Sequence, residues 1–241
     1  MVSEQAAIVV GVGPGLGWAV AQRFAQAGLH TIVAARDRGK LEALIARSDR
    51  NVAPPERFEA RACDTTSPAD VAALFSSFDR DGRAPAVVVY NAGAFVPAGI
   101  LDITPEELER CWRVGCFGGF LVGQAAARLM TRHGSGTIIF TGATASLRGS
   151  ARFANLAVPK FGLRALAQSM ARELGPKNIH VAHVIIDGQI RSERYRALAD
   201  ERGPDAMLAP EAIAETYYRL HVQPRSAWTH ELDLRPWSEK F

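Results

Sequence analysis

Six short apolar runs alternate with longer stretches that carry helix signals, and this alternation constrains the fold more than any other feature. The runs are rich in β-branched residues, as strands are, and they cover residues 6–10, 31–35, 58–63, 86–90, 137–141 and 180–186. The middle runs are apolar almost throughout, which is typical of strands buried on both faces of a parallel sheet. We therefore predict an α/β fold, a doubly wound parallel sheet with helices on both faces.

The stretches between the runs carry specific helix start and stop signals. Ser67 precedes a proline, which places an N-cap residue before a proline at the first helical position. Thr104 and Glu107 form a capping-box pattern. A helix over 153–174 is expected to end at a Gly-Pro pair, and residues 210–221 are expected to form another helix.

Length and composition limit the class of protein. A chain of 241 residues fits one unit of this architecture, so we expect 1–241 to be a single domain. Hydrophobic residues make up 48% and charged residues 22%, a globular balance that excludes a disordered or fibrous chain. The apolar runs are far shorter than the roughly 20 residues of a bilayer span, so we expect no membrane association. The 28 basic residues are scattered, so we expect no nucleic-acid partner.

Cysteines, histidines and the first residues suggest a compartment. Three cysteines without a CxxC pair do not indicate a disulfide framework. The histidines show no ligand spacing, so no metal site is expected. The first five residues contain an acid where a signal peptide carries bases. These features are typical of a cytoplasmic enzyme.

A glycine-rich turn follows the first predicted strand. Gly11, Gly15 and Gly17 fit the pattern GxxxGxG, and Gly13 and Leu16 belong to the same segment. Without Cβ atoms, such a turn lets the backbone approach a pyrophosphate, which the N-terminus of the next helix stabilises. The alternative is a tight strand–helix turn that binds nothing. The position directly after the first strand favours a dinucleotide site.

The end of the second predicted strand bears on the choice of dinucleotide. Ala35 stands where an acid would repel a 2′-phosphate, and Arg36 stands where an arginine accepts that phosphate. Both residues favour NADP(H) over NAD(H). Asp37 leaves the other choice open, because a shift of one residue would make it the ligand of the ribose hydroxyls. The alternative for Arg36 is an ordinary surface arginine.

With these residues placed, the chain resembles the short-chain dehydrogenase/reductase family over nearly its whole length. The resemblance rests on the glycine turn and on three further places: Cys63-Asp64 after the third strand, Asn91-Ala92-Gly93 after the fourth, and Lys160 on the helix after the fifth. The segment Asp187-Gly188-Gln189-Ile190 is similar to the PGxI turn of that family, with Asp in place of Pro. The resemblance implies a Rossmann-like fold that binds a nicotinamide dinucleotide.

The resemblance also implies individual roles and partners. It implies that Asp64 contacts the adenine, that Asn91, Ala92 and Gly93 line the cofactor, and that Lys160 binds the nicotinamide ribose. By the same resemblance, Gly188 and Ile190 belong to the cofactor site. The family acts on small molecules and usually assembles as homodimers or homotetramers. A small-molecule substrate and a homodimer or homotetramer are therefore expected here.

The expected catalytic positions depart from the family pattern. Family members use a Tyr four residues before the Lys, and here that residue is Leu156; enoyl reductases place their Tyr at the position of Phe153. The expected Ser falls on Ala143, and the expected Asn falls on Gly115. Only Lys160 of the four standard groups is retained. General acid–base catalysis is typically worth about 10²–10⁴-fold, so we expect ordinary ketone reduction to be impaired.

Three residues are candidates for a substitute proton donor. Thr144 and Ser146 follow the fifth strand beside the expected Ser position, and Tyr195 follows the sixth. The alternative for the two hydroxyls is a hydrogen bond to local backbone, and the alternative for Tyr195 is an exposed surface position. The alternative for Lys160 itself is a solvated lysine on an amphipathic helix.

Two segments near the C-terminus carry expectations about substrate access and assembly. Residues 191–208 are expected to form a mobile segment that covers the substrate. The aromatic and arginine-rich stretch 225–237 has the composition of an interface, which favours a homo-oligomer; the alternative is a tail folded back on its own subunit.

Three functions are compatible with these residues. The first is an NADP(H)-binding oxidoreductase that transfers a hydride to or from a small carbonyl, alcohol or enone with a non-standard or absent proton donor. The second is an inactive cofactor-binding sensor or partner subunit. The third is a scaffold without cofactor. It would not explain why residues 91–93 and Lys160 match the family pattern.

Overall fold

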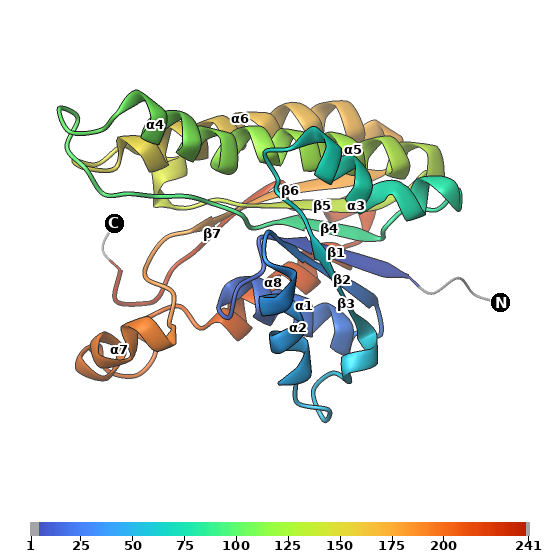
Figure 1. Cartoon of the computed structure of the whole chain (residues 1–241), viewed down its shortest axis with the longest axis horizontal. Coiled ribbons are helices and arrows are strands. Elements are labelled where there is room, and N and C mark those ends of the chain that lie inside the picture. The colour runs from blue at the N-terminus through green and yellow to red at the C-terminus, as the bar shows by residue number, and fades with distance from the viewer. Residues whose placement is uncertain (1–4, 240–241) are drawn as a thin grey trace.

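A computed structural model describes residues 5–239 as a single parallel sheet covered by helices on both faces (Figure 1). The sheet has seven strands in the order β3-β2-β1-β4-β5-β6-β7, and the doubly wound α/β fold is confirmed. The strands are β1 (Ala6–Val10), β2 (His30–Ala35), β3 (Phe58–Ala62), β4 (Val87–Tyr90), β5 (Gly136–Thr141), β6 (Ile179–Ile186) and β7 (Glu231–Leu234).

Eight α-helices are described between and after these strands. They are α1 (Leu16–Gln26), α2 (Arg38–Ala46), α3 (Pro68–Arg80), α4 (Pro105–Trp112), α5 (Gly118–His133), α6 (Ala154–Leu174), α7 (Arg196–Arg202) and α8 (Pro210–His221). A π-helical turn, Arg113–Phe117, joins α4 to α5. The capping patterns behave as predicted: the side chain of Ser67 accepts a hydrogen bond from the third helical residue, and Thr104 and Glu107 form a full capping box.

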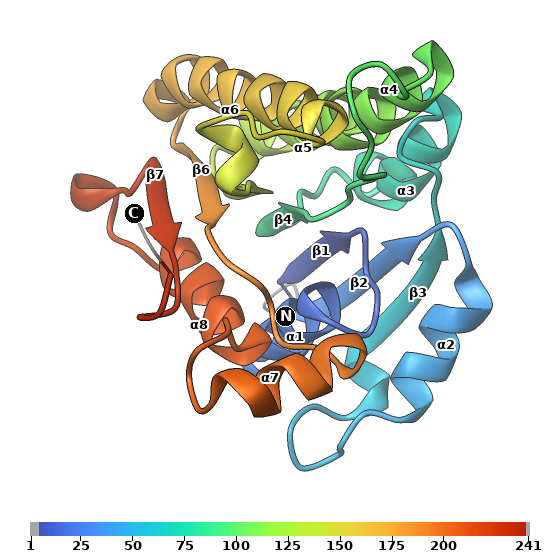
Figure 2. The same cartoon turned by 90° about the vertical axis from the view of Figure 1, so that its left-hand side faces the viewer.

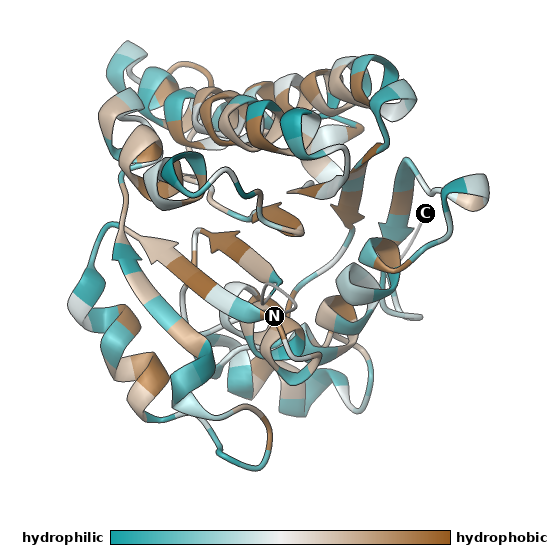
Figure 3. Cartoon of the chain, turned by 90° about the vertical axis from the view of Figure 1, so that its right-hand side faces the viewer, coloured by the Kyte–Doolittle hydropathy of each residue, from teal (hydrophilic) through white to brown (hydrophobic). Residues whose placement is uncertain are grey.

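The alternating side chains of the central strands build two cores, one on each face of the sheet. In β1, Val9 packs with α1 and α8, whereas Ile8 packs on the other face with α3 and α5. Figure 1 shows α4, α5 and α6 above the sheet and α1, α2 and α8 below it, and Figure 3 shows hydrophobic strands between these layers. Each fully buried aliphatic side chain contributes about 1.5–3 kcal/mol, so the two cores fix the sheet on which the site is built.

The six predicted strands match the observed ones to within one residue at each end. The seventh strand, β7, was not among them. Its sequence, Glu-Leu-Asp-Leu, alternates charged and apolar residues, and it pairs in parallel with β6. This part of the tail is therefore folded back on its own subunit, and the homo-oligomer stays a prediction.

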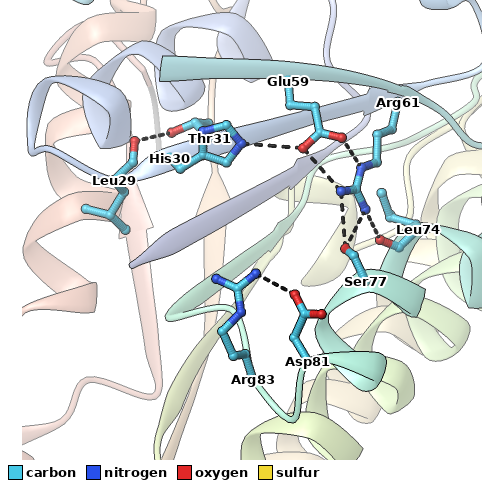
Figure 4. Close-up of polar contacts among 9 residues, drawn as sticks. All are labelled: Leu29, His30, Thr31, Glu59, Arg61, Leu74, Ser77, Asp81 and Arg83. Carbon is cyan, nitrogen blue, oxygen red and sulfur yellow. Dashed lines mark hydrogen bonds and ion pairs between the residues drawn. The ribbon is translucent and has the colours of Figure 1, made fainter. Parts of the chain in front are cut away.

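Strand β3 forms one edge of the sheet, and two of its side chains belong to a polar cluster (Figure 4). The guanidinium of Arg61 donates to the carboxylate of Glu59, to the Ser77 hydroxyl and to the carbonyl oxygen of Leu74 on α3. His30 on β2 lies 3.4 Å from the same carboxylate. Charged side chains on an edge strand discourage pairing with another chain, so the cluster protects this edge of the sheet.

Candidate active site

The candidate site lies where the parallel strands end. The strand order places β1, β4, β5 and β6 side by side, and the segments that follow these strands carry Gly11, Asn91, Thr144 and Gly188. Ligands of doubly wound sheets bind at this edge. Figure 2 shows the helix α7 near the start of α1, at the same end of the molecule.

One side of the glycine turn packs tightly against the protein, and its other side has free space. Gly11 adopts φ +85°, and a Cβ there would lie 2.4 Å from the backbone nitrogen of Ala92, so only glycine fits. The Asn91 side chain donates to the carbonyl oxygen of Gly11 at 3.1 Å. A Cβ on Gly13 or Gly15 would meet no atom within 4 Å. The turn therefore packs against the residues after β4 on one side and presents an unobstructed surface at Gly13 and Gly15.

Helix α1 begins directly at this turn. Gly15 is its N-cap residue, and no side chain caps the helix. Leu16 and Gly17 are buried in its first turn, and a Cβ on Gly17 would lie 2.9 Å from the carbonyl oxygen of Gly11. An uncapped helix N-terminus presents N–H groups and a partial positive charge. The local structure is therefore suited to a phosphate group.

A hollow of about 310 Å³ opens beside the glycine turn. Its lining includes Ala35 and Arg36 from β2, Asp64 after β3 and residues 91–94 after β4, so the structure brings these predicted residues together. The Asp37 carboxylate accepts a hydrogen bond from the backbone N–H of Lys40 and caps α2. The lining of the hollow thus includes Arg36 but not Asp37.

Lys160 is buried, 7% exposed, and does not lie on a solvated helix face. Its Nζ donates to the carbonyl oxygen of Thr141 at 2.7 Å, and burial lowers the pKa of the ammonium to about 8. The Thr141 hydroxyl lies 2.9 Å from the hydroxyl of Tyr217 on α8. One helical turn before Lys160 stands Leu156, which has no polar group to offer. The lysine is therefore held at the end of β5 by backbone.

Pro159, directly before Lys160, interrupts the hydrogen bonding of α6. Facing it is Gly115 in the π-helical turn between α4 and α5, where a Cβ would lie 2.8 Å from the Cβ of Pro159. The Asn155 amide donates to the carbonyl oxygen of Val96, while its Oδ1 is buried with no hydrogen-bond partner in the described structure. The proline thus occupies the space that any side chain at position 115 would need.

The hydroxyl of Thr144 points to a buried carboxylate. Its Oγ1 donates to Oδ1 of Asp187, which directly follows β6 and is 4% exposed. Arg235, just after β7, forms an ion pair with Oδ2 of Asp187 at 3.0 Å and a second ion pair with Asp233. A hydroxyl, a carboxylate and a guanidinium are thus connected in one chain at the end of β5, β6 and β7.

The hydroxyl of Ser146 is fully buried and has other partners. It accepts a hydrogen bond from the backbone N–H of Ala143 and lies 3.4 Å from Nε2 of His183. Nδ1 of His183 lies 3.1 Å from the carboxylate of Glu231, which accepts two hydrogen bonds of 2.7 Å from Arg164. Burial lowers the pKa of His183 to about 4, so the imidazole is neutral at pH 7. This chain stabilises the loop after β5 from inside the protein.

Tyr195 lies on the segment after β6, away from these chains. It ends a short 3-10 helix, Glu193–Tyr195, and the guanidinium of Arg194 lies 5.5 Å from its ring centroid. The two ends of the segment are joined, since Ile190 and Leu208 form an isolated bridge and the N–H of Arg191 donates to the carbonyl oxygen of Leu208. The segment is therefore a closed loop anchored at its base.

Several of the polar residues in these chains were not predicted as site residues. Among them are His183, Glu231 and Arg235; Arg164 and Asp233 were not predicted either, and Asp187 was quoted only as a departure from the PGxI turn. The alternation of charged and apolar residues at 231–235 was the available signal, because it marks a strand whose alternate side chains share one face.

Within residues 5–239, no group of three or more His, Cys, Asp or Glu side chains could hold a metal ion. In the same part of the chain, no helix has the length and apolar character needed to cross a bilayer. The three cysteines are free thiols.

Comparison with known proteins bears directly on this site. The short chain dehydrogenase family profile matches residues 5–202. The 3-oxoacyl-[acyl-carrier-protein] reductase MabA of Mycobacterium tuberculosis is 33% identical over 199 residues, which is 83% of this chain and 74% of that protein. The crystal structure of a short-chain dehydrogenase from Rhodopseudomonas palustris is 40% identical, covers 96% of this chain and 99% of that chain, and superposes with a TM-score of 0.81. A metagenomic short-chain oxidoreductase in complex with NADP is 26% identical, with 96% of each chain covered and a TM-score of 0.79.

Proposed function

The chain belongs to the short-chain dehydrogenase family of NAD(P)-dependent oxidoreductases, and from that premise we propose that it is an NADP(H)-dependent enzyme with a non-standard proton donor. The proposed reaction moves a hydride between the cofactor and a small carbonyl, alcohol or enone. The observation that carries the proposal is the hydrogen bond between Thr144 and the buried carboxylate of Asp187 at the end of β5 and β6.

The residues present fit a dinucleotide. The open faces of Gly13 and Gly15 and the uncapped N-terminus of α1 suit a pyrophosphate. The hollow lined by Arg36 and Asp64 suits the adenosine end. At the other end, Lys160, Gly188 and Ile190 would hold the nicotinamide half, which supplies or accepts the hydride when bound.

The charges at the adenosine end support NADP(H) over NAD(H). The Asp37 carboxylate, the other candidate ligand of the ribose hydroxyls, caps α2 and does not line the hollow. Arg36 lines the hollow, and a guanidinium matches a phosphate better than any other side chain. The metagenomic relative was solved with NADP, in agreement with this preference.

Thr144 is the best placed of the three candidate hydroxyls. Ser146 is fully buried and already bonded within the loop, and Tyr195 lies on the segment after β6. Thr144 is half-buried, directly follows the position of the family's Ser, and has a carboxylate to exchange its proton with. A hydroxyl backed by a base is a general acid–base pair.

Residues 191–208 belong to the proposal as a mobile cover over the substrate. The joined ends at Ile190 and Leu208 leave α7 free of the sheet (Figure 2), and a loop closed at its base can move as a unit. We also place the enzyme in the cytoplasm, as its composition indicates.

Self-association is part of the proposal, on a different surface from the C-terminal tail. Large apolar side chains on α4, α5 and α6 are 36% to 51% exposed: Leu108, Trp112, Phe120, Val158 and Phe161. Exposed apolar patches of this kind mark interaction sites, and a second copy of the chain is the expected partner. Light scattering after size-exclusion chromatography should give a dimer or tetramer, and Trp112→Glu with Phe120→Glu should give a monomer.

Calorimetric titration with NADPH and NADH, followed by a substrate screen in both directions, tests the main proposal. The screen starts from 3-oxoacyl thioesters and 3-hydroxysteroids, which are the classes named for two relatives, and extends to small ketones and enones. We expect micromolar NADPH binding, weaker NADH binding and turnover that falls at least tenfold in Thr144→Val. NADPH binding without turnover of any substrate would favour an inactive sensor or partner subunit, for which the apolar residues Leu156 and Ala143 are the supporting observation.

A further inference from the structure

The carboxylate of Asp187 is fixed in place by partners on two neighbouring strands. Oδ1 accepts a hydrogen bond from Thr144 after β5, and Oδ2 pairs with Arg235 after β7 at 3.0 Å. The side chain is 4% exposed, so little water screens its charge. This sequence has an acid at position 187, whereas the similar turn of the resembled family has a proline there.

The charges around Asp187 do not cancel. Arg235 is shared with a second carboxylate, Asp233. A Cβ on Gly188 would lie 3.4 Å from Oε2 of Glu239, so a third carboxylate lies beside the same turn. Among the residues that the structure describes, three carboxylates (Asp187, Asp233 and Glu239) lie at this turn with the Arg235 guanidinium, and the Lys160 ammonium lies at the end of the neighbouring β5. The carboxylates outnumber these two cations.

This turn is the place at which the nicotinamide half would bind. Gly188, with φ +144°, follows Asp187 directly, and Ile190 is two residues further on. Lys160 is the opposing positive charge, held on the Thr141 carbonyl at the end of β5. The adenosine end, with Arg36 and Asp64, lies across β1 at the ends of β2 and β3.

A nicotinamide ring carries one positive charge when oxidised and none when reduced, so a nearby fixed charge separates the affinities of the two forms. We propose that Asp187 makes this site bind the oxidised dinucleotide more tightly than the reduced one, and the oxidised form is the one used in the direction of alcohol oxidation. This inference rests on the proposed function and specifies which redox form of the cofactor the site prefers.

The hydrogen bond from Thr144 agrees with that direction. Thr144 accepts the hydroxyl proton of the alcohol as its own proton passes to the Asp187 carboxylate. The electron pair of the carbinol C–H bond leaves as hydride to the oxidised dinucleotide, and the product is the ketone or aldehyde. One proton and one hydride leave the alcohol, so the step balances. The Asp187 carboxylate accepts the hydrogen bond of Thr144 and is therefore placed to take up this proton.

The test is the ratio of the dissociation constants of NADPH and NADP⁺, measured by calorimetry at pH 7.5 without any substrate. Asp187→Asn removes the charge and keeps an oxygen that can accept from Thr144. It should shift the ratio about tenfold toward NADPH, which corresponds to about 1.4 kcal/mol or roughly 30 mV for a two-electron couple. Arg235→Met leaves the carboxylate without its guanidinium and should shift the ratio the opposite way.

The matched control is Asp64→Asn, the same substitution at the adenosine end. It should weaken both redox forms equally and leave the ratio unchanged. Opposite shifts in Asp187→Asn and Arg235→Met support the inference. A ratio within twofold of the wild type in Asp187→Asn, with both dinucleotides still bound, overturns it and leaves the proposed function standing.

If Asp187→Asn does not fold, Arg235→Met decides: a shift toward NADP⁺ supports the inference, and an unchanged ratio overturns it. A wild-type protein that binds neither dinucleotide overturns both this inference and the proposed function.

Discussion

The substitution Lys160→Met should make the protein more stable at pH 7, because it removes a buried charge. The ammonium is buried, and burial lowers its pKa from 10.5 to about 8. The unfolded chain therefore binds the proton more tightly than the folded one, and unfolding is favoured wherever that proton is present. Each unit of difference is worth about 1.4 kcal/mol, so the charge costs the wild type about 3 kcal/mol at pH 7.

Methionine keeps most of the aliphatic length and removes the charge. It also removes the hydrogen bond from Nζ to the Thr141 carbonyl, which offsets about 1–2 kcal/mol of the gain. A net stabilisation of about 1–2 kcal/mol at pH 7 is expected. The sign of the pH dependence follows from the lowered pKa: wild-type stability rises as the pH passes from 8 to 10.5, because the unfolded lysine loses its proton there. The advantage of the variant should therefore shrink by about 2 kcal/mol between pH 7 and pH 10.

Urea unfolding followed by far-UV circular dichroism at the two pH values measures this difference. Other groups titrate identically in both proteins, so they cancel in the comparison. Lys177→Met, at an exposed lysine just after α6, is the matched control and should show no change with pH. A stability difference between Lys160→Met and wild type that is the same at pH 7 and pH 10 would refute the reasoning, because it would mean that burial does not disfavour the charged lysine.

Three further changes have outcomes that follow from the structure. Arg36→Ala should weaken NADPH binding at least tenfold in calorimetry and leave NADH binding unchanged; equal losses would show that the arginine does not contact the 2′-phosphate. Gly11→Ala should destabilise the protein by about 2–4 kcal/mol in urea unfolding, because its Cβ would lie 2.4 Å from the Ala92 nitrogen at φ +85°, and Gly13→Ala, which meets no atom within 4 Å, is the control. Burial lowers the pKa of His183 from 6.5 to about 4, so its contribution to stability is present above pH 6.5 and is lost as the pH falls toward 4. Over that range the wild type should lose about 2–3 kcal/mol more of its free energy of unfolding than His183→Gln. Parallel curves of unfolding free energy against pH for the two proteins would contradict this.

The sequence predicted what depends on local pattern. Apolar β-branched runs gave six strands, and short capping patterns at Ser67 and Thr104 gave helix starts, because both are decided by neighbours in the chain. Strand β7 was missed, because a short edge strand with alternating charges lacks the continuous apolar character of its neighbours.

The polar chains of the site could not be predicted in the same way. Asp187 and Arg235 are 48 residues apart and meet only because β6 and β7 pair in parallel. The same holds for His183 and Glu231, which the strand register sets opposite each other. Spacing alone did not show that the Asp37 carboxylate accepts a hydrogen bond from the backbone N–H of Lys40 and caps α2. Long-range pairs of this kind depend on strand register, which the chain shows only once folded.

The contact between Gly115 and Pro159 limits the order in which this active site can change during evolution. An asparagine introduced at position 115 would collide with a proline whose Cβ lies 2.8 Å from the place of the new Cβ. Because the contact is made by a Cβ atom, Pro159→Gly is the replacement that opens that space; it also restores a backbone donor to α6, after which the asparagine becomes tolerable. The two substitutions are therefore expected to show sign epistasis: the same mutation at position 115 is harmful in one background and acceptable in the other. While position 159 carries a Cβ, position 115 therefore cannot accept an asparagine in one neutral step.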